Sequence, residues 1–266
     1  MAISKALLLS LALPAAVALP VTLAFAVLAP AARADTAQQI VAGADKVRNP
    51  DKPFRSTATL VAYNSGRPVD KNVFTVFSKV DAATGQFRDL VIYVDPPRDA
   101  GKTMLFAGQY LWFYDPASKD SVRISPQQQL VGQAAAGDVL TVNFAVDYAA
   151  TMIGTESIAD AGGKSRACAH IDLKPAKASA IYNRIEYWVE QGTDFPVKAK
   201  FYSDSGQLLK ILYYRGAKTR NSPEQAVILD AVNPALVTTV DFSEARFQDI
   251  PDSWFQRDYL PHLKPN

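Results

Sequence analysis

The chain has 266 residues, of which 48% are hydrophobic and 20% are charged, and its formal net charge is +2. Lys5 and Arg33 are the only charged residues before residue 35, so the remainder carries 26 basic (28 − 2 = 26) and 26 acidic side chains. A neutral chain lacks the surplus of Lys and Arg that phosphate binding needs, which argues against nucleic acid as a partner. The single cysteine, Cys168, excludes an intramolecular disulfide, and its place in a strand-like segment predicts a buried, unreactive thiol.

Residues 1–34 have the pattern of an export signal. Lys5 precedes a long apolar run, and Ala32-Arg33-Ala34 places small residues where a signal peptidase reads the chain. We expect cleavage after Ala34 and a soluble exported protein that begins at Asp35; an uncleaved membrane anchor is the alternative, because the run could span a bilayer. No linker or shift in composition divides residues 35–266, so we expect them to form one domain.

One helix precedes a long series of strands. Thr36 can cap a helix whose apolar residues recur at helical spacing until Asn49-Pro50 ends it. After Pro53 the sequence alternates between apolar and polar residues, with turns too closely spaced for crossover helices, which predicts sequential antiparallel pairing. The predicted strands are Ser56–Tyr63, Val73–Val80, Phe87–Val94, Lys102–Ala107, Tyr110–Tyr114, Ser121–Ser125, Ser165–Leu173, Ile181–Val189, Val197–Tyr202, Leu208–Tyr214, Ala226–Ala231 and Leu236–Phe242. So many antiparallel strands in one domain must curl into a barrel or form two sheets.

The stretch 126–153 does not alternate, and it separates the two runs of strands. Val139, Leu140 and Phe144 recur at roughly helical spacing, so we predict one or two short amphipathic helices here. Such a segment is either a static plug of a barrel end or a movable lid, and the sequence does not distinguish the two.

Several predicted strands are apolar on both faces, whereas Ile181–Val189 has one polar face that we expect to be exposed to solvent. On that strand Ile185, Tyr187 and Val189 share the apolar side. By contrast, 90–94, 111–113 and 208–214 are apolar on both sides, which indicates either a filled core or a cavity for an apolar ligand.

Enzyme hypotheses find little support in the sequence. His170 and His262 are the two histidines, too few for a zinc site of the HExxH type, and no nucleophile elbow or phosphate-binding glycine loop occurs. We expect His170 to be a satisfied strand residue and His262 to be solvated. We therefore expect no catalytic residue, no metal and no cofactor.

Two stretches of sequence resemble the LolA/LolB family of periplasmic lipoprotein carriers. One is Gly108–Pro116, which reads GQYLWFYDP, and the other is Ile171-Asp-Leu-Lys-Pro175 with the strand after it. The order of elements is also similar to that family over most of residues 35–266. The resemblance implies a mainly β fold with a few helices: one curved antiparallel sheet forming an incomplete, half β-barrel, covered by the N-terminal helix and a helical lid within 126–153.

The resemblance also implies a function, namely binding the acyl chains of a lipoprotein or lipid in an apolar cavity and delivering them toward the outer membrane. Expected partners are an inner-membrane donor complex, an outer-membrane acceptor and the membrane surface in transient contact. Candidate cavity residues are Leu90, Ile92, Leu111, Trp112, Phe113, Tyr114, Ile185, Tyr187, Val189, Phe201 and Leu212, and candidate lid residues are Leu130, Val139, Leu140 and Phe144.

Departures from the family leave alternatives open. The family has an Arg-Pro pair followed by an aromatic residue, where the Arg holds the lid; here Arg88 lacks the Pro and follows the aromatic residue, so that role is not assigned to it. The tail 247–255 is additional and could pack over the sheet edge. A lipid-responsive sensor on the same fold is the alternative function, and an integral outer-membrane barrel is disfavoured by short strands with charges on both faces.

Overall fold

The structure is a computed structural model that describes residues 35–216 and 222–263. The expected export signal, 1–34, lies outside the described residues, so its cleavage stays a prediction. Within the described residues, no helix is both long enough and apolar enough to span a membrane.

One antiparallel sheet of fourteen strands contains nearly all of the β structure. Its strand order is β6-β5-β4-β3-β2-β1-β15-β14-β13-β12-β11-β10-β9, with β16 paired to β1, and the sheet is not closed because β6 and β9 remain as its edges. The bounds are β1 Phe54–Asn64, β2 Arg67–Val80, β3 Phe87–Asp95, β4 Thr103–Ala107, β5 Tyr110–Asp115, β6 Asp120–Ile124, β9 Tyr148–Ala159, β10 Ser165–Pro175, β11 Arg184–Glu190, β12 Pro196–Tyr202, β13 Leu208–Gly216, β14 Pro223–Asp230, β15 Leu236–Phe242 and β16 Arg246–Phe247.

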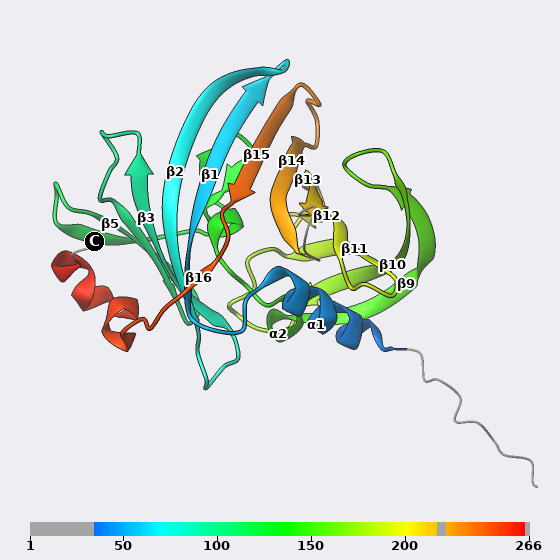
Figure 1. The fold of residues 1–266 in the computed structure, drawn as a ribbon, viewed down its shortest axis with the longest axis horizontal. Helices are drawn as coiled ribbons and strands as arrows, with labels where there is room; N and C mark the ends of the chain where they lie inside the picture. Colours follow the sequence, from blue (N-terminus) through cyan, green and yellow to red (C-terminus); the bar gives the residue numbers. More distant parts are fainter. Residues whose placement is uncertain (1–34, 217–221, 264–266) are drawn as a thin grey trace, which may run out of the picture. The chain divides into compact units, whose positions relative to one another are not determined.

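The twelve predicted strands are all present, and the predicted mainly β class is confirmed. Successive hairpins build β6 to β1 and β9 to β15, and the two halves meet where β1 pairs with β15 at the register Leu60↔Val240 (Figure 1). The long stretch between β6 and β9 is therefore the one break in an otherwise sequential antiparallel order.

The N-terminal helix begins and ends where its sequence signals predict. Helix α1 spans Ala37–Arg48, with Thr36 and Gln39 forming a reciprocal capping box and Asn49 at the C-cap. Val41 and Ala44 are fully buried against the sheet. The helix thus covers one face, which we call the inner face of the sheet and define by Leu60, Phe74, Ile185 and the residues that cluster with them.

The C-terminal segment covers the opposite, outer face of β2–β5. Ile250, Phe255 and Leu260 pack there against Phe77 and Leu90. Two short 3₁₀ turns, η2 (Asp252–Phe255) and η3 (Arg257–His262), carry these contacts and lie beside β3 and β5 in Figure 1. The tail thus packs over a face of the sheet and not over its edge.

The segment between β6 and β9 contains much less helix than the sequence predicted. It forms a small hairpin of β7 (Gln129–Val131) and β8 (Ala134–Ala135), a 3₁₀ turn η1 (Ala136–Val139) and one turn of helix, α2 (Phe144–Asp147). Residues 148–153, the end of the stretch in which we predicted short helices, begin the edge strand β9. The segment lies on the inner face, as predicted, and its two short helical turns, η1 and α2, lie where the predicted helical spacing occurs, while the rest of the segment is not helical.

Candidate functional site

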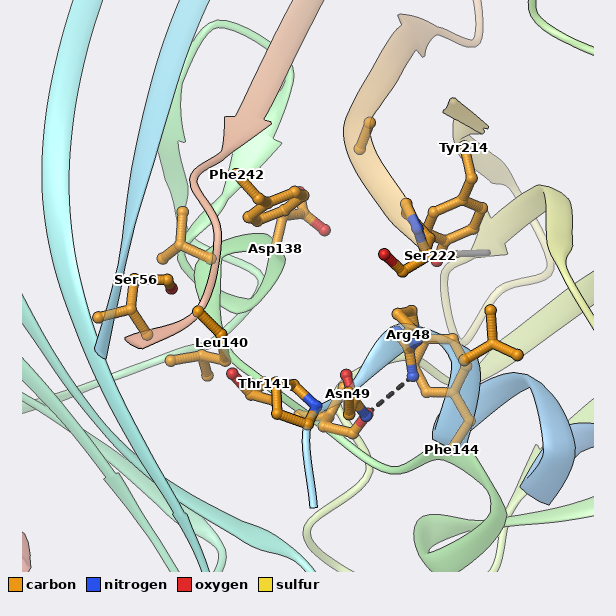
Figure 2. Close-up of a pocket in the computed structure, with 18 of the residues that line it drawn as sticks. Arg48, Asn49, Ser56, Asp138, Leu140, Thr141, Phe144, Tyr214, Ser222 and Phe242 are labelled. Carbon is orange, nitrogen blue, oxygen red and sulfur yellow. Dashed lines mark hydrogen bonds between the residues drawn. The ribbon is translucent and has the colours of Figure 1, made fainter. Parts of the chain in front are cut away.

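A cavity of about 350 Å³ lies on the inner face, between the end of α1, the 137–144 part of the covering segment and strands β12–β15. Figure 2 shows Arg48 and Tyr214 on one side of it and Ser56 and Phe242 on the other. Its wall is mostly apolar, with Val47, Phe54, Val76, Val139, Leu140, Val142, Phe144, Ile181, Phe201, Leu212 and Phe242 among the lining residues. The volume lies near the lower end of the range for small-molecule sites, roughly 300–1,000 Å³, and suits one chain of an amphiphile.

Five of the predicted cavity and lid residues line this cavity. They are Phe201 and Leu212 from the sheet and Val139, Leu140 and Phe144 from the covering segment. Leu111, Ile185, Tyr187 and Val189 lie on the same inner face but are fully or almost fully buried in the core beneath it. Phe113 and Leu130 line a second cavity of about 400 Å³, next to the β7–β8 hairpin.

The remaining four predicted residues lie on the outer face, away from both cavities. Leu90, Ile92, Trp112 and Tyr114 pack with the C-terminal tail. The alternation along β5 explains this, because Leu111 and Phe113 point inward and their neighbours must point outward. The expectation that Trp112 and Tyr114 line the inner face is therefore corrected.

Arg88 also serves the tail and not the covering segment. Its Nη2 donates to Asp252 at 2.7 Å, and its guanidinium lies 5.2 Å from the centre of the Phe255 ring. The decision not to assign it the family's lid-holding role agrees with this placement.

A buried ion pair joins the covering segment to the sheet at the cavity wall. Asp138, in η1, accepts hydrogen bonds from the Lys210 ammonium of β13, from the Tyr182 hydroxyl (2.9 Å) and from the Ala135 backbone N–H (2.8 Å). The Lys210 ammonium also donates to the Tyr182 hydroxyl at 2.7 Å. The side chains of Lys210 and Asp138 are only 6% and 5% exposed, so water screens their attraction weakly.

The environment of this ion pair shifts the pKa values of Lys210 and Tyr182. Burial lowers the pKa of Lys210, and the facing Asp138 carboxylate opposes that effect. Burial and the same carboxylate raise the pKa of Tyr182 well above its ordinary value. The hydroxyl therefore stays protonated and donates to Asp138 throughout the physiological range.

The second half of the covering segment is tied to α1. The Arg48 Nη2 donates to the Val142 carbonyl at 2.7 Å, and the Asn49 amide donates to the same oxygen at 2.8 Å. Asp45 accepts from the Ala145 N–H at 2.8 Å, and Gln38 donates to the Ala145 carbonyl at 2.8 Å. Residues 142–145 are thus fixed to the helix by side chains from one face of it.

Another buried carboxyl lies under residue 141. Asp89 is fully buried on β3 and accepts a hydrogen bond from the Ser78 hydroxyl, which lies 2.8 Å from the Thr141 hydroxyl. Burial raises the pKa of Asp89 to about 7, more than its hydrogen bonds lower it. A hydroxyl relay therefore links β2, β3 and the covering segment.

The residues considered for catalysis occupy structural positions. Cys168 is fully buried, as expected, and burial raises the pKa of its thiol to about 11. His170 stacks on Trp188 with ring centres 4.1 Å apart and lies 3.0 Å from Glu156, while His262 is exposed. Among the described residues, no group of three or more potential ligands is placed to hold a metal ion.

Sequence reasoning missed the polar part of the cavity wall. Arg48 carries no local signal beyond its place before Asn49-Pro50 at the end of the predicted helix, and Asp138 simply follows Gly137 in a stretch that does not alternate. Lys210 lies between leucine and isoleucine in a strand otherwise apolar on both faces, which is the one local signal that could have indicated a buried charge with a partner.

Known structures share this fold. A LolA superfamily protein from Nitrosomonas europaea is 30% identical, with 85% of this chain and 100% of that chain aligned at a TM-score of 0.74. A DUF1329 family protein from Desulfovibrio piger is 19% identical, with 84% of this chain and 97% of that chain aligned at a TM-score of 0.67. A domain from Vibrio parahaemolyticus, described as a candidate outer membrane lipoprotein-sorting protein, is 18% identical, with 85% of this chain and 98% of that chain aligned at the same TM-score. These two show the fold alone.

Comparisons of sequence add one family match. A family model described as "-like: Uncharacterized protein" matches residues 85–262, and none of the curated proteins matches the chain significantly. The match at 30% identity spans the full length of the Nitrosomonas protein and includes both halves of the open sheet. The chain therefore belongs to the LolA superfamily, the fold of outer membrane lipoprotein-sorting proteins.

Proposed function

We propose that this protein is a periplasmic carrier that holds acyl chains of a lipoprotein or lipid in the inner-face cavity and delivers them toward the outer membrane. The observation that carries the proposal is the cavity itself, which is walled by aromatic and aliphatic side chains although the neighbouring core is closely packed. An apolar cavity in such a core is a ready site for an apolar ligand. Membership of the LolA superfamily supports the same conclusion.

The energetics fit a carrier that must also release its cargo. Burying one methylene contributes about 0.8 kcal/mol, so roughly ten methylenes in the cavity would contribute about 8 kcal/mol. Before the cost of immobilising the ligand is subtracted, that free energy corresponds to a dissociation constant of about 1 μM, which is the tightest binding that this burial gives. Transfer from an inner-membrane donor complex to an outer-membrane acceptor, with transient contact at each membrane, needs a complex of this intermediate strength.

A carrier of this kind must be exported, and the proposal includes cleavage after Ala34. The chemistry proposed is binding and transfer without a catalytic step. Within the cavity wall, Asp138 is engaged in an ion pair with Lys210 and a hydrogen bond with Tyr182 that position the covering segment.

A fluorescent acyl probe tests the proposal directly. We expect the native protein to bind the probe with micromolar affinity, and Leu212→Gln, which places an amide in the cavity wall, to weaken binding at least ten-fold. Ile211→Gln is the matched control, because Ile211 is the neighbour of Leu212 on the same strand and its side chain points to the outer face. Equal weakening by both variants, or no probe binding by the unmodified protein, would contradict the carrier proposal.

A further inference from the structure

Arg48 is a charged residue in the mostly apolar wall of the cavity, and one of its donors is unsatisfied. It is the last residue of α1, its side chain is 15% exposed, and it lines the cavity beside Phe144 and Tyr214 (Figure 2). Nη2 donates to Asp45 and to the Val142 carbonyl, both at 2.7 Å. The guanidinium carbon lies 4.1 Å from the centre of the Phe144 ring.

The Nε–H of Arg48 has no hydrogen-bond partner among the described residues, and it is shielded from water. A buried donor without an acceptor costs about 1–3 kcal/mol and more for a charged group, so such atoms are uncommon in folded proteins. The Tyr187 hydroxyl, on the strand beneath, is also without a partner in the part of the chain described. Arg48 lines the cavity, whereas Tyr187 lies in the core beneath it, so of these two residues Arg48 is the one that can meet an acceptor entering the cavity from outside the chain.

The charges around Arg48 narrow the chemistry of that acceptor. Burial lowers the pKa of the Arg48 guanidinium, but Tyr214, Tyr187 and Asp45 outweigh burial and raise it, so the group is always protonated. Asp45 balances that charge and is itself buried, with its second oxygen accepting from the Ala145 N–H. An already paired cation with a free N–H suits an oxygen acceptor, whether neutral or anionic.

We infer that Arg48 binds the carbonyl oxygen at the polar end of a single acyl chain whose methylenes fill the rest of the cavity. This inference rests on the proposed function and specifies its ligand: one chain with a carboxylate or an ester oxygen, as opposed to plain hydrocarbon. The chain would extend from Arg48 past Leu212 toward Phe242, along the apolar wall. A free fatty acid and an ester-linked chain share this oxygen, and the choice of probe separates the two.

The test compares three probes of equal length: laurate, methyl laurate and 1-bromododecane. Arg48→Met keeps an apolar stem and removes the donors. We expect it to weaken binding of methyl laurate about ten-fold or more and to change binding of 1-bromododecane less than two-fold. An equal loss for laurate and methyl laurate would show that the oxygen is recognised regardless of charge, whereas a loss confined to laurate would show that the ligand is a free acid.

Arg55→Met is the matched control, because Arg55 lies over the Phe77 ring on the outer face, away from the cavity, and its removal takes away the same formal charge. We expect it to change binding of methyl laurate less than three-fold. Equal weakening of all three probes by Arg48→Met would overturn the inference and assign Arg48 a purely structural role, while the carrier proposal would stand. Failure of the unmodified protein to bind any probe would overturn the carrier proposal itself.

A measurement on the unmodified protein covers the case in which Arg48→Met does not fold. The ¹⁵N-¹H resonance of the Arg48 Nε should shift and become protected from hydrogen exchange when methyl laurate is added, and should not respond to 1-bromododecane. An identical response to both probes would contradict a hydrogen bond from Arg48 to the ligand.

Discussion

Removing the ammonium of Lys210 should destabilise the protein by about 3–5 kcal/mol, because it leaves the Asp138 carboxylate buried without its ion-pair partner. Lys210→Met has a similar volume, so little of the loss comes from a cavity. Asp138→Asn leaves the Lys210 ammonium buried without its counter-charge and should also cost about 3–5 kcal/mol, although its amide oxygen can still accept from Tyr182 or from the Ala135 N–H. These losses are measured by urea denaturation.

The double variant shows whether the two side chains act as a pair. With both charges removed, no unpaired charge remains, and we expect the double variant to be at least 2 kcal/mol more stable than the sum of the single losses predicts. Hydrogen exchange should rise at the amides of 128–139 in each single variant, because the pair ties η1 to β13. Losses that add within 0.5 kcal/mol, a threshold set at roughly the usual error of additivity, would refute the claim that this pair holds the covering segment on the sheet.

Three further predictions concern the same segment. The folded-state pKa of Asp89 is about 7 and its ordinary value is 3.8, so between these pH values the folded state keeps a proton that the unfolded state releases. Stability should therefore fall as pH rises from 4 to 7, by on the order of 4 kcal/mol. Asp89→Asn should abolish this fall, which is measured by denaturation at several pH values. Gly132→Ala should lower stability by about 1–3 kcal/mol and speed acyl-probe entry in stopped-flow measurements, because the added Cβ would collide with the sheet. Gly66→Ala is the control: its added Cβ has open space around it, so probe entry should be unchanged. Phe144→Ser should lower the free energy of unfolding by roughly 2–4 kcal/mol yet raise acyl-probe affinity if the segment moves as a lid. Tyr187→Ser, in the fixed core, should lower stability with no gain in affinity. If the two variants change melting temperature and affinity in parallel, the segment is a static plug.

The strands were predictable because each carries its own signal. Residues 184–187 alternate between partly exposed and buried positions, and positive-φ glycines such as Gly85 and Gly108 mark turns next to strands. The edge strand β9 was missed because it has little to alternate: most of its side chains are exposed, and Met152 and Ile153 are neighbours that both contact solvent. An edge strand paired on one side only can tolerate such a sequence.

The faces of the sheet were harder to predict than the strands. Period-two alternation separates Trp112 from Leu111 and Phe113 but does not say which set faces the cavity. The aromatic residues of β5 suggested an inner wall, whereas the tail around Phe255 covers Trp112 on the outer face. The contact between β5 and the tail joins residues more than 130 positions apart, so no local pattern could reveal it.

The cavity itself depends on pairs that are distant in sequence. Asp138 and Lys210 are 72 residues apart, and Arg48 reaches Val142 across 94. Leu212 and Phe201 were predicted as part of the apolar cavity that the family resemblance implies, whereas the charged residues were missed because a buried charge is recognisable only together with its partner.

The carrier account is tested most directly by asking what the protein holds when it is isolated from cells. Native mass spectrometry of the purified protein, followed by denaturation and analysis of the organic extract, measures noncovalent cargo and its chemistry together. We predict about one acyl-bearing molecule per protein, lost on denaturation and absent from Leu212→Gln. Protein that carries no acyl compound, and that also fails to bind laurate or methyl laurate after purification, would contradict the account.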